Sequence, residues 1–236
     1  MKYKYGGYFI MKKITKGLLV ILEGGEGAGK TSQAKKLVEY YNDKGYNTKY
    51  FREPGGNEIA ENIRNMILYN EMDPTTEILL MNAARNININ NNLLPALNDG
   101  CLVILDRFAK STKVYQGILK NGNMKFIEQC ESMVKKPIID SSYILEFTLL
   151  CDPKVAIERA AAEGHERNKH DVLPIEDYKK INDAYSRLYI QDVNTIGAVH
   201  SMIDTTNMDM EKVFKRLVGT IDNVIALRGT VEEYYG

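Results

Sequence analysis

A glycine-rich loop between an apolar segment and a helical pattern constrains this chain more than any other feature of the sequence. Residues 24–31 read G-x-x-x-x-G-K-T and directly follow the apolar run 18–22. Glycines let successive backbone N–H groups converge on phosphate oxygens, the lysine brings a positive charge to the transferable phosphate, and the threonine hydroxyl can bind Mg²⁺. The loop therefore predicts a nucleoside triphosphate site with Lys30 as a catalytic residue and Thr31 as a Mg²⁺ ligand. The residues expected to contact the triphosphate are Gly24, Gly25, Glu26, Gly27, Ala28, Gly29, Lys30, Thr31 and Ser32.

The bulk composition fits an ordinary globular protein whose anion site is local. The chain has 236 residues, and 44% of them are hydrophobic, enough for the core of one α/β domain. Because 31 Lys and Arg balance 31 Asp and Glu, the overall charge argues against nucleic-acid and membrane partners. The three cysteines are far apart and lie in or beside apolar stretches, which suits reduced thiols in a cytoplasmic protein.

Two stretches stand apart from the apolar pattern. Residues 1–16 are rich in Tyr and Lys and lack an apolar run long enough for a signal peptide or a membrane span, so we expect a loose N-terminal extension. Residues 163–171 carry charges of both signs without apolar periodicity, which predicts a mobile lid near 159–173. The remainder, 17–236, is expected to form a single domain around this lid.

Apolar segments and helical patterns alternate along that domain. Strands are expected at 18–22, 48–52, 101–105, 142–150 and 198–203. Helices are expected at 32–44, 57–69, 75–97, 111–119, 124–134, 155–162, 174–189 and 209–227. This order predicts an α/β fold in which a five-stranded parallel sheet is covered by helices on both faces.

An asparagine-rich run at 86–92 is the one compositionally odd segment. Under a functional interpretation, this run contacts the base of a nucleotide. The interpretation that we favour is a helix whose Ile and Leu residues face the core.

A carboxylate and an arginine follow the third predicted strand. Asp106 ends the apolar run 102–105, where an acid at the carboxyl edge of a parallel sheet can hold Mg²⁺ or a catalytic water. Arg107 would then point a bidentate cation at a phosphate in the same crevice, unless the two residues form only a surface ion pair.

Several further motifs, taken together with the loop, resemble thymidylate kinases. Arg52 to Gly56 read R-E-P-G-G, Asp106 to Phe108 read D-R-F, and Tyr115 to Gly117 read Y-Q-G. The remaining matching residues are Ile63, Arg64, Ala83, Ala84, Arg85, Pro95, Ala96, Leu97 and Ser111. The resemblance implies a P-loop nucleoside monophosphate kinase fold, commonly a homodimer, that transfers the γ-phosphoryl group of ATP to dTMP.

The family's motifs imply roles around the acceptor phosphate and sugar. Arg107 resembles the arginine that grips the acceptor phosphate, and Arg64 is expected to join it. Asp106 resembles the carboxylate that organises Mg²⁺ and water. Glu26 matches an acid that hydrogen-bonds the deoxyribose hydroxyl, and Tyr115 resembles the ring that excludes a 2′-hydroxyl. The alternatives are a solvated loop acid for Glu26 and an ordinary helix tyrosine for Tyr115.

The same resemblance assigns the base end. Arg85 resembles the residue that reads the thymine carbonyl, with Thr112 and Gln116 along the base edge and Ser111 in the acceptor site. Glu53 either contacts the metal region or makes a structural hydrogen bond to the neighbouring loop.

Two positions and the lid depart from the family pattern. Met81 stands where a stacking Phe is usual, and Phe108 replaces a Tyr, so a reshaped acceptor pocket is expected. The lid keeps only two arginines, of which Arg167 is the first and Arg159 the second candidate for charge stabilisation during transfer. The departures leave two alternatives open: a kinase for other or modified deoxynucleoside monophosphates, and a nucleotide-binding module without transfer activity.

Overall fold

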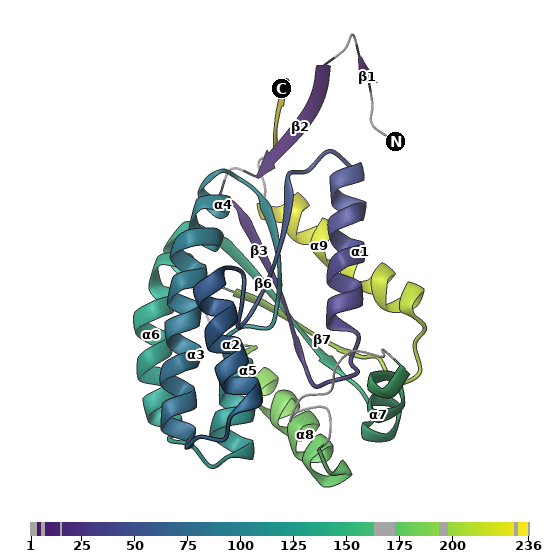
Figure 1. Ribbon diagram of the computed structural model, residues 1–236. Coiled ribbons are helices and arrows are strands. Elements are labelled where there is room, and N and C mark those ends of the chain that lie inside the picture. The colour runs from purple at the N-terminus through teal and green to yellow at the C-terminus, as the bar shows by residue number, and fades with distance from the viewer. Residues whose placement is uncertain are drawn as a thin grey trace.

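The computed structural model describes residues 4–5, 8–14, 16–162, 173–193, 198–228 and 231–235. Its centre is a five-stranded parallel sheet, as the sequence predicts, with the strand order β4-β5-β3-β6-β7 (Figure 1). The strands are β3 (Leu18–Gly24), β4 (Thr48–Arg52), β5 (Leu102–Asp106), β6 (Tyr143–Leu150) and β7 (Ala198–Asp204). Each of the five predicted strands is present, with bounds that agree within two residues.

The sheet is buried on both faces because its central strands are apolar at nearly every position. All seven residues of β3 are buried. Leu18, Val20 and Leu22 pack into one core cluster together with apolar residues of α1 (Lys30–Asp43) and α9 (Met210–Arg228). Leu19 and Ile21 pack on the opposite face, against the helices that follow β4.

The second face is covered by a helical layer that the chain builds between β4 and β6 (Figure 1). Its elements are α2 (Glu58–Tyr69), α3 (Pro74–Asn88), η1 (Ile89–Leu93), α4 (Leu94–Asn98), α5 (Ala109–Thr112), η2 (Lys113–Leu119) and α6 (Met124–Ser141). The side chains of Asn57, Asp73 and Asn123 cap α2, α3 and α6 by accepting backbone N–H bonds in the first turn. Two more helices, α7 (Pro153–Ala162) and α8 (Ile175–Asp192), lie between β6 and β7 in the chain.

Three predicted helices differ from the structure in detail. The helix expected at 75–97 is divided into α3, the π-helical turn η1 and α4, and most of the helix expected at 111–119 is the π-helix η2. Such wide turns depend on local packing, which the apolar period does not encode. Helix α6 continues through Pro137 to Ser141, whereas the predicted helix ends at residue 134.

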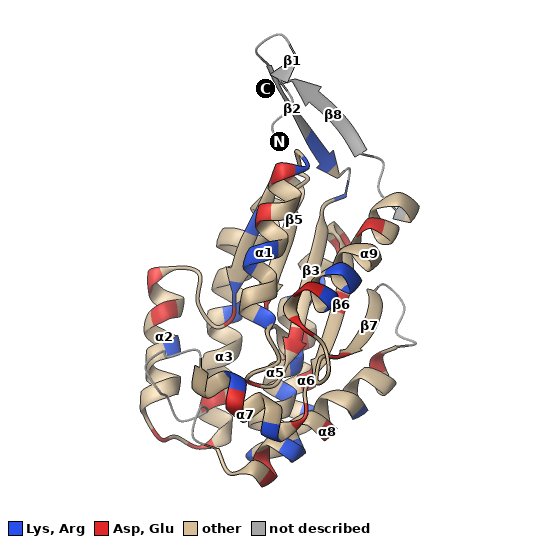
Figure 2. Ribbon diagram, turned by 90° about the vertical axis from the view of Figure 1, so that its right-hand side faces the viewer, with Lys and Arg blue, Asp and Glu red and all other residues tan. Residues whose placement is uncertain are grey.

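The N-terminal segment differs from the expected loose extension. It contains β1 (Lys4–Tyr5) and β2 (Tyr8–Ile14), which join β8 (Val231–Tyr235) in a separate antiparallel sheet of order β1-β2-β8. At the domain end of β2, the Ile14 backbone N–H donates to the Gly100 carbonyl over 3.0 Å. Figure 1 shows β1 and β2 at one end of the molecule, and in Figure 2 the coloured part of β2 lies at the same end. Local patterns miss this sheet because the partner strand lies at the other end of the sequence.

No helix in the described ranges combines the length and the apolar character that crossing a bilayer requires.

Candidate active site

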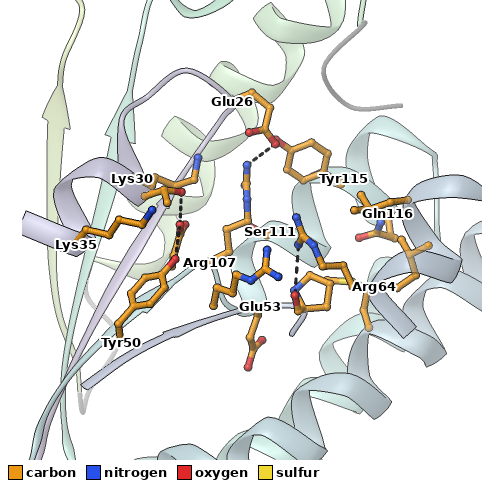
Figure 3. A pocket seen from close by; sticks show the side chains of 17 residues that line it. Glu26, Lys30, Lys35, Tyr50, Glu53, Arg64, Arg107, Ser111, Tyr115 and Gln116 are labelled. Carbon is orange, nitrogen blue, oxygen red and sulfur yellow. Dashed lines mark hydrogen bonds and ion pairs between the residues drawn. The ribbon is translucent and has the colours of Figure 1, made fainter. Parts of the chain in front are cut away.

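A pocket of about 430 Å³ opens at the carboxyl edge of the sheet, where β3, β4 and β5 end (Figure 3). The parallel register brings these ends together, since Arg52 of β4 and Leu22 of β3 both pair with Asp106 of β5. The predicted site residues that line the pocket are Glu26, Lys30, Thr31, Glu53, Arg64, Met81, Asp106, Arg107, Ser111, Tyr115 and Gln116. Six further residues line the pocket that were not predicted as site residues: Lys35, Tyr50, Arg52, Pro54, Ile67 and Leu68.

The glycine-rich loop joins β3 to α1 and curls over the start of the helix. Gly27 and Gly29 have φ angles of +71° and +86°, which L side chains rarely adopt. A Cβ at Gly27 would also lie 2.1 Å from the carbonyl oxygen of Ala156 in α7, so only glycine fits there. Ser32 lies in the first turn of α1 and Ala28 is buried beneath the loop, so neither lines the pocket.

Lys30 begins α1 and points its amine into the loop. Its Nζ donates to the Gly25 carbonyl over 2.7 Å, and the residue is only 5% exposed. Burial, followed by the positive charge of Arg107, lowers the pKa of Lys30. A desolvated ammonium held by a neutral carbonyl gains much more from an anion than a solvated one would.

Thr31 and Asp106 lie side by side at the end of β5. The Thr31 hydroxyl donates to Asp106 Oδ2 over 2.5 Å, and the Tyr50 hydroxyl approaches the same oxygen at 3.5 Å. Burial and the Asp106 charge raise the pKa of Tyr50 to about 12, so this phenol remains a hydrogen-bond donor at neutral pH. The group presents hydroxyl and carboxylate oxygens, the hard donors that Mg²⁺ prefers.

Arg107 forms a tight turn after β5 and reaches across to the loop. Its φ is +68°, an uncommon backbone conformation for a side chain of this size. The guanidinium donates to the Gly24 carbonyl over 2.9 Å and to Glu26 Oε1 over 2.5 Å, with the Ser111 and Tyr185 hydroxyls at 3.3 Å. Although burial opposes it, the Glu26 carboxylate and further negative groups raise the pKa of Arg107.

A buried carboxylate that the sequence analysis does not assign, Glu23, holds this turn in place. Its Oε1 accepts the backbone N–H groups of Phe108 and Ser111 over 2.9 and 3.1 Å. Its Oε2 accepts the Ser111 hydroxyl over 2.6 Å and the Tyr185 hydroxyl over 3.3 Å. Burial and the nearby Glu146 charge raise the pKa of Glu23. The available sequence signal is an acid at the end of an otherwise apolar strand.

Arg64 is a second cation beside Arg107. It projects from α2, and its Nη1 donates to the Pro54 carbonyl over 3.3 Å. Burial lowers the pKa of Arg64, and the positive charges of Arg52 and Arg107 add to that effect. Arg52 itself pairs with Glu61 over 2.7 Å. The Arg64 guanidinium therefore lies among like charges, where a bound anion relieves both burial and repulsion.

Arg85 lies behind the pocket wall. Its Nε donates to Glu53 Oε2 over 2.7 Å, and the two side chains are 0% and 1% exposed. Its Nη2 donates to the Phe108 carbonyl over 3.1 Å and to the Thr112 hydroxyl over 2.9 Å. Arg85 and Thr112 do not line the described pocket, which differs from their expected place on the base edge. Of the two roles predicted for Glu53, this pairing favours the structural one.

The asparagine-rich run holds the neighbouring R-E-P-G-G loop. Asn92 Nδ2 donates to the Gly56 carbonyl over 3.1 Å, and the Asn88 amide donates to Glu53 Oε1 over 3.3 Å. Ile89 of this run and Leu93, which follows it, are buried in the core, as the favoured interpretation predicts. The run therefore combines core packing with support for the loop.

Tyr115 and Gln116 lie across the pocket from Lys30 (Figure 3), at the end expected to hold the base. Met81 also lines the pocket. The Arg107 guanidinium lies 5.3 Å from the centre of the Tyr115 ring, which connects this end to the cations. Gln116 Nε2 donates to Glu77 Oε2 over 3.0 Å.

The two lid arginines have different outcomes. Arg167 lies outside the described residues, as do residues 163–172 of the predicted lid. Arg159 lies in α7 and donates to Cys151 Sγ, to the Thr205 hydroxyl and to the carbonyl oxygens of Thr205, Thr206 and Met208. It fixes the segment after β7 and does not line the described pocket.

Known proteins are similar to this chain in sequence and in fold. A sequence model of the thymidylate kinase family matches residues 22–208 of the chain. The thymidylate kinase of Caldicellulosiruptor saccharolyticus is 33% identical over 217 residues, which cover 90% of this chain and 100% of that protein. The thymidylate kinase of Shouchella clausii is 32% identical, with coverages of 88% and 99%. The crystal structure of thymidylate kinase from Ehrlichia chaffeensis superposes with a TM-score of 0.68 at 24% identity, covering 87% of this chain and 98% of that one, and so shares its fold.

Proposed function

The chain belongs to the thymidylate kinase family, and from that premise we propose that it phosphorylates dTMP to dTDP with ATP, a step of dTTP biosynthesis. The observation that carries the proposal is one pocket with two kinds of phosphate site. Lys30 of the glycine-rich loop lines the same pocket as the cations Arg64 and Arg107. The phosphoryl group would pass from a donor bound at the loop to an acceptor bound at these arginines.

The phosphate groups are held by cations whose present partners can be exchanged. Lys30 leaves the Gly25 carbonyl to bind the donor phosphates, while Arg107 and Arg64 bind the acceptor phosphate. Transfer is in line and without a covalent enzyme intermediate, so catalysis consists of positioning and charge stabilisation. Arg167 is our candidate for a further lid cation, and the contacts of Arg159 favour a supporting role for that residue.

Mg²⁺ fits the oxygen pair formed by Thr31 and Asp106. Mg²⁺ usually keeps several waters and takes only one or two protein oxygens plus substrate phosphates. When bound, the ion neutralises charge on the donor phosphates. Thr31 and Asp106 orient that region, and Tyr50 fixes Asp106 from the side.

The sugar and base of dTMP occupy the end beside Tyr115. Glu26 hydrogen-bonds the deoxyribose hydroxyl once the acceptor phosphate draws Arg107 away from it, and the Tyr115 ring limits space at the 2′ position. Met81 covers one face of the base and Gln116 contacts its edge. Arg85, Thr112 and Glu53 support this end from behind, and Ser111 ties it to the Arg107 turn.

A homodimer accounts for apolar side chains on the outer helical layer. Helices α2, α3 and α6 lie side by side in Figure 1. Their exposed large apolar residues are Ile59, Met66, Tyr69, Leu79, Met133 and Ile139. Light scattering on the purified chain measures the assembly, and a mass of one chain contradicts the dimer.

The free, buried cysteines Cys101, Cys130 and Cys151 suit the reducing cytoplasm.

ADP production with separate acceptors tests the function. The assay supplies Mg²⁺ and ATP with dTMP, dUMP, dCMP, dGMP, dAMP or UMP in turn. We expect a strong preference for dTMP. Comparable turnover of several acceptors would replace this proposal with a broader deoxynucleotide kinase, and ATP binding without acceptor-dependent ADP would indicate a binding module.

A further inference from the structure

The Gln116 amide, at the base end of the pocket across from Lys30 (Figure 3), is held by a buried carboxylate that forms an ion pair with a partly exposed lysine. Gln116 Nε2 donates to Glu77 Oε2 over 3.0 Å. Lys120, which follows η2, donates to the other oxygen of the same carboxylate over 2.6 Å. The Glu77 side chain is 0% exposed, so water does not compete for it. These contacts connect α3 to the helical segment that carries the base-edge residue.

The ion pair decides which end of the Gln116 amide faces Glu77. A carboxylate held by an ammonium at 2.6 Å is ionised and can only accept hydrogen bonds. The amide must therefore turn its N–H₂ group toward Glu77, and its oxygen must point elsewhere. The amide oxygen and nitrogen have nearly the same shape, so shape alone cannot tell them apart. The need of the Glu77 carboxylate for a donor does.

The Gln116 oxygen that results is an acceptor in need of a donor. Oε1 is buried and has no hydrogen-bond partner among the described residues. A buried acceptor left in this state costs about 1–3 kcal/mol, which a ligand recovers by supplying an N–H group. A ligand that places an acceptor atom opposite Gln116 Oε1 binds more weakly, because neither atom supplies a proton for a hydrogen bond.

We propose that Glu77, supported by Lys120, is a positioning residue that locks the Gln116 amide so that the acceptor site selects pyrimidines with an N3–H group over cytosine. The inference rests on the proposed function, since it assumes that the base lies beside Gln116. Thymine and uracil carry a hydrogen-bond donor at N3, whereas cytosine carries an acceptor there. Glu77 thus sets specificity without touching the nucleotide.

The substitution Glu77→Gln tests the lock with little change of shape. An amide at position 77 both donates and accepts, so Gln116 is free to rotate and present either end. The assay is calorimetric binding of dUMP and of dCMP to the full chain, because neither base has a 5-methyl group. We expect wild-type protein to prefer dUMP, and the ratio of the two dissociation constants to fall about tenfold in the variant.

A double-mutant cycle shows whether Glu77 acts through Gln116. Gln116→Leu removes the amide and should also lower the dUMP preference. In that background Glu77→Gln should leave the ratio unchanged, because the group it positions is gone. Lys120→Met should lower the ratio in the same direction as Glu77→Gln, and it serves as the test should the first variant fail to fold.

Glu128→Gln, the same change at an exposed position of α6, is the matched control and should leave the ratio unaltered. The inference is overturned if Glu77→Gln weakens both nucleotides equally, or if it still shifts the ratio in the Gln116→Leu background. Binding needs no phosphoryl transfer, so an intact lock in a protein that makes no ADP would sink the proposed function alone. Wild-type protein that binds neither nucleotide would sink both.

Discussion

The cations at the two ends of the pocket have different hydrogen-bond partners. At the phosphate end, Lys30 and Arg64 donate to backbone carbonyls, and burial lowers the pKa of each. At the base end, Arg85 is paired with Glu53 at 2.7 Å and is fully buried. A cation held by neutral groups, or by an ion pair that is partly open to solvent such as Arg107–Glu26, can still bind an anion. A cation matched inside a fully buried pair, as Arg85 is, supports the structure. The two arrangements therefore predict different responses to mutation.

The largest effect is expected from Lys30→Ala, which removes the central cation of the phosphate end. We expect kcat/KM for ATP and dTMP to fall by roughly 10³-fold, because an oriented charge at the transferring group is lost. The free energy of unfolding should hold or rise, since the lowered pKa of Lys30 shows that folding disfavours its charged form. Coupled ADP assays and urea unfolding measure the two quantities. Lys125→Ala, at an exposed position of α6, is the control, and a near-normal rate in Lys30→Ala contradicts the assignment.

The base end should respond in stability. Glu53→Gln leaves the Arg85 guanidinium buried without a matching charge, so we expect the free energy of unfolding to drop by about 3 kcal/mol. Urea unfolding followed by circular dichroism measures the drop. Glu39→Gln makes the same change at an exposed position of α1 and should stay within about 0.5 kcal/mol of wild type. Equal stabilities of Glu53→Gln and Glu39→Gln would contradict a structural role for the Arg85–Glu53 pair.

The smallest effect concerns pH and the Glu23 carboxylate between the two ends. Burial and Glu146 raise the pKa of Glu23 above its ordinary 4.5, so the folded state binds its proton more tightly than the unfolded state does. That contribution to stability is complete below pH 4.5 and is lost as the pH rises through the folded-state pKa. Glu23→Gln removes the titration. In urea titrations, wild type should therefore lose stability relative to the variant as the pH rises above 4.5, and a relative gain would contradict the raised pKa.

Local sequence patterns were sufficient for most of the parallel sheet. Runs such as 102–105 are apolar at every position, which only a strand buried on both faces requires, and the glycine-rich loop fixed the order of β3 and α1. The antiparallel sheet was out of reach because β2 and β8 are separated by nearly the whole chain. The π-helical turns at η1 and η2 were missed because they depend on packing between helices.

The site was predictable where a motif names the chemistry and unpredictable where contacts join distant segments. Thr31 and Asp106 were expected near each other, and their side chains touch at 2.5 Å. The pairing of Arg85 with Glu53 was not predicted, because Glu53 lies 32 residues earlier in the chain and no local pattern joins the two. Glu23 shows the same limit, because its partner Tyr185 is 162 residues away.

The pairing of Arg107 with Glu26 and the Gly24 carbonyl has a consequence for inhibitor chemistry. Both partners belong to the same chain as Arg107, so they compete with a dissolved anion at a high effective concentration. A compound that adds negative charge must exchange with this pair and gains only the difference between the two interactions. A neutral compound that fills the space beside Tyr115 leaves the pair intact. Potency against this pocket should therefore rise more with shape at the base end than with added anionic groups.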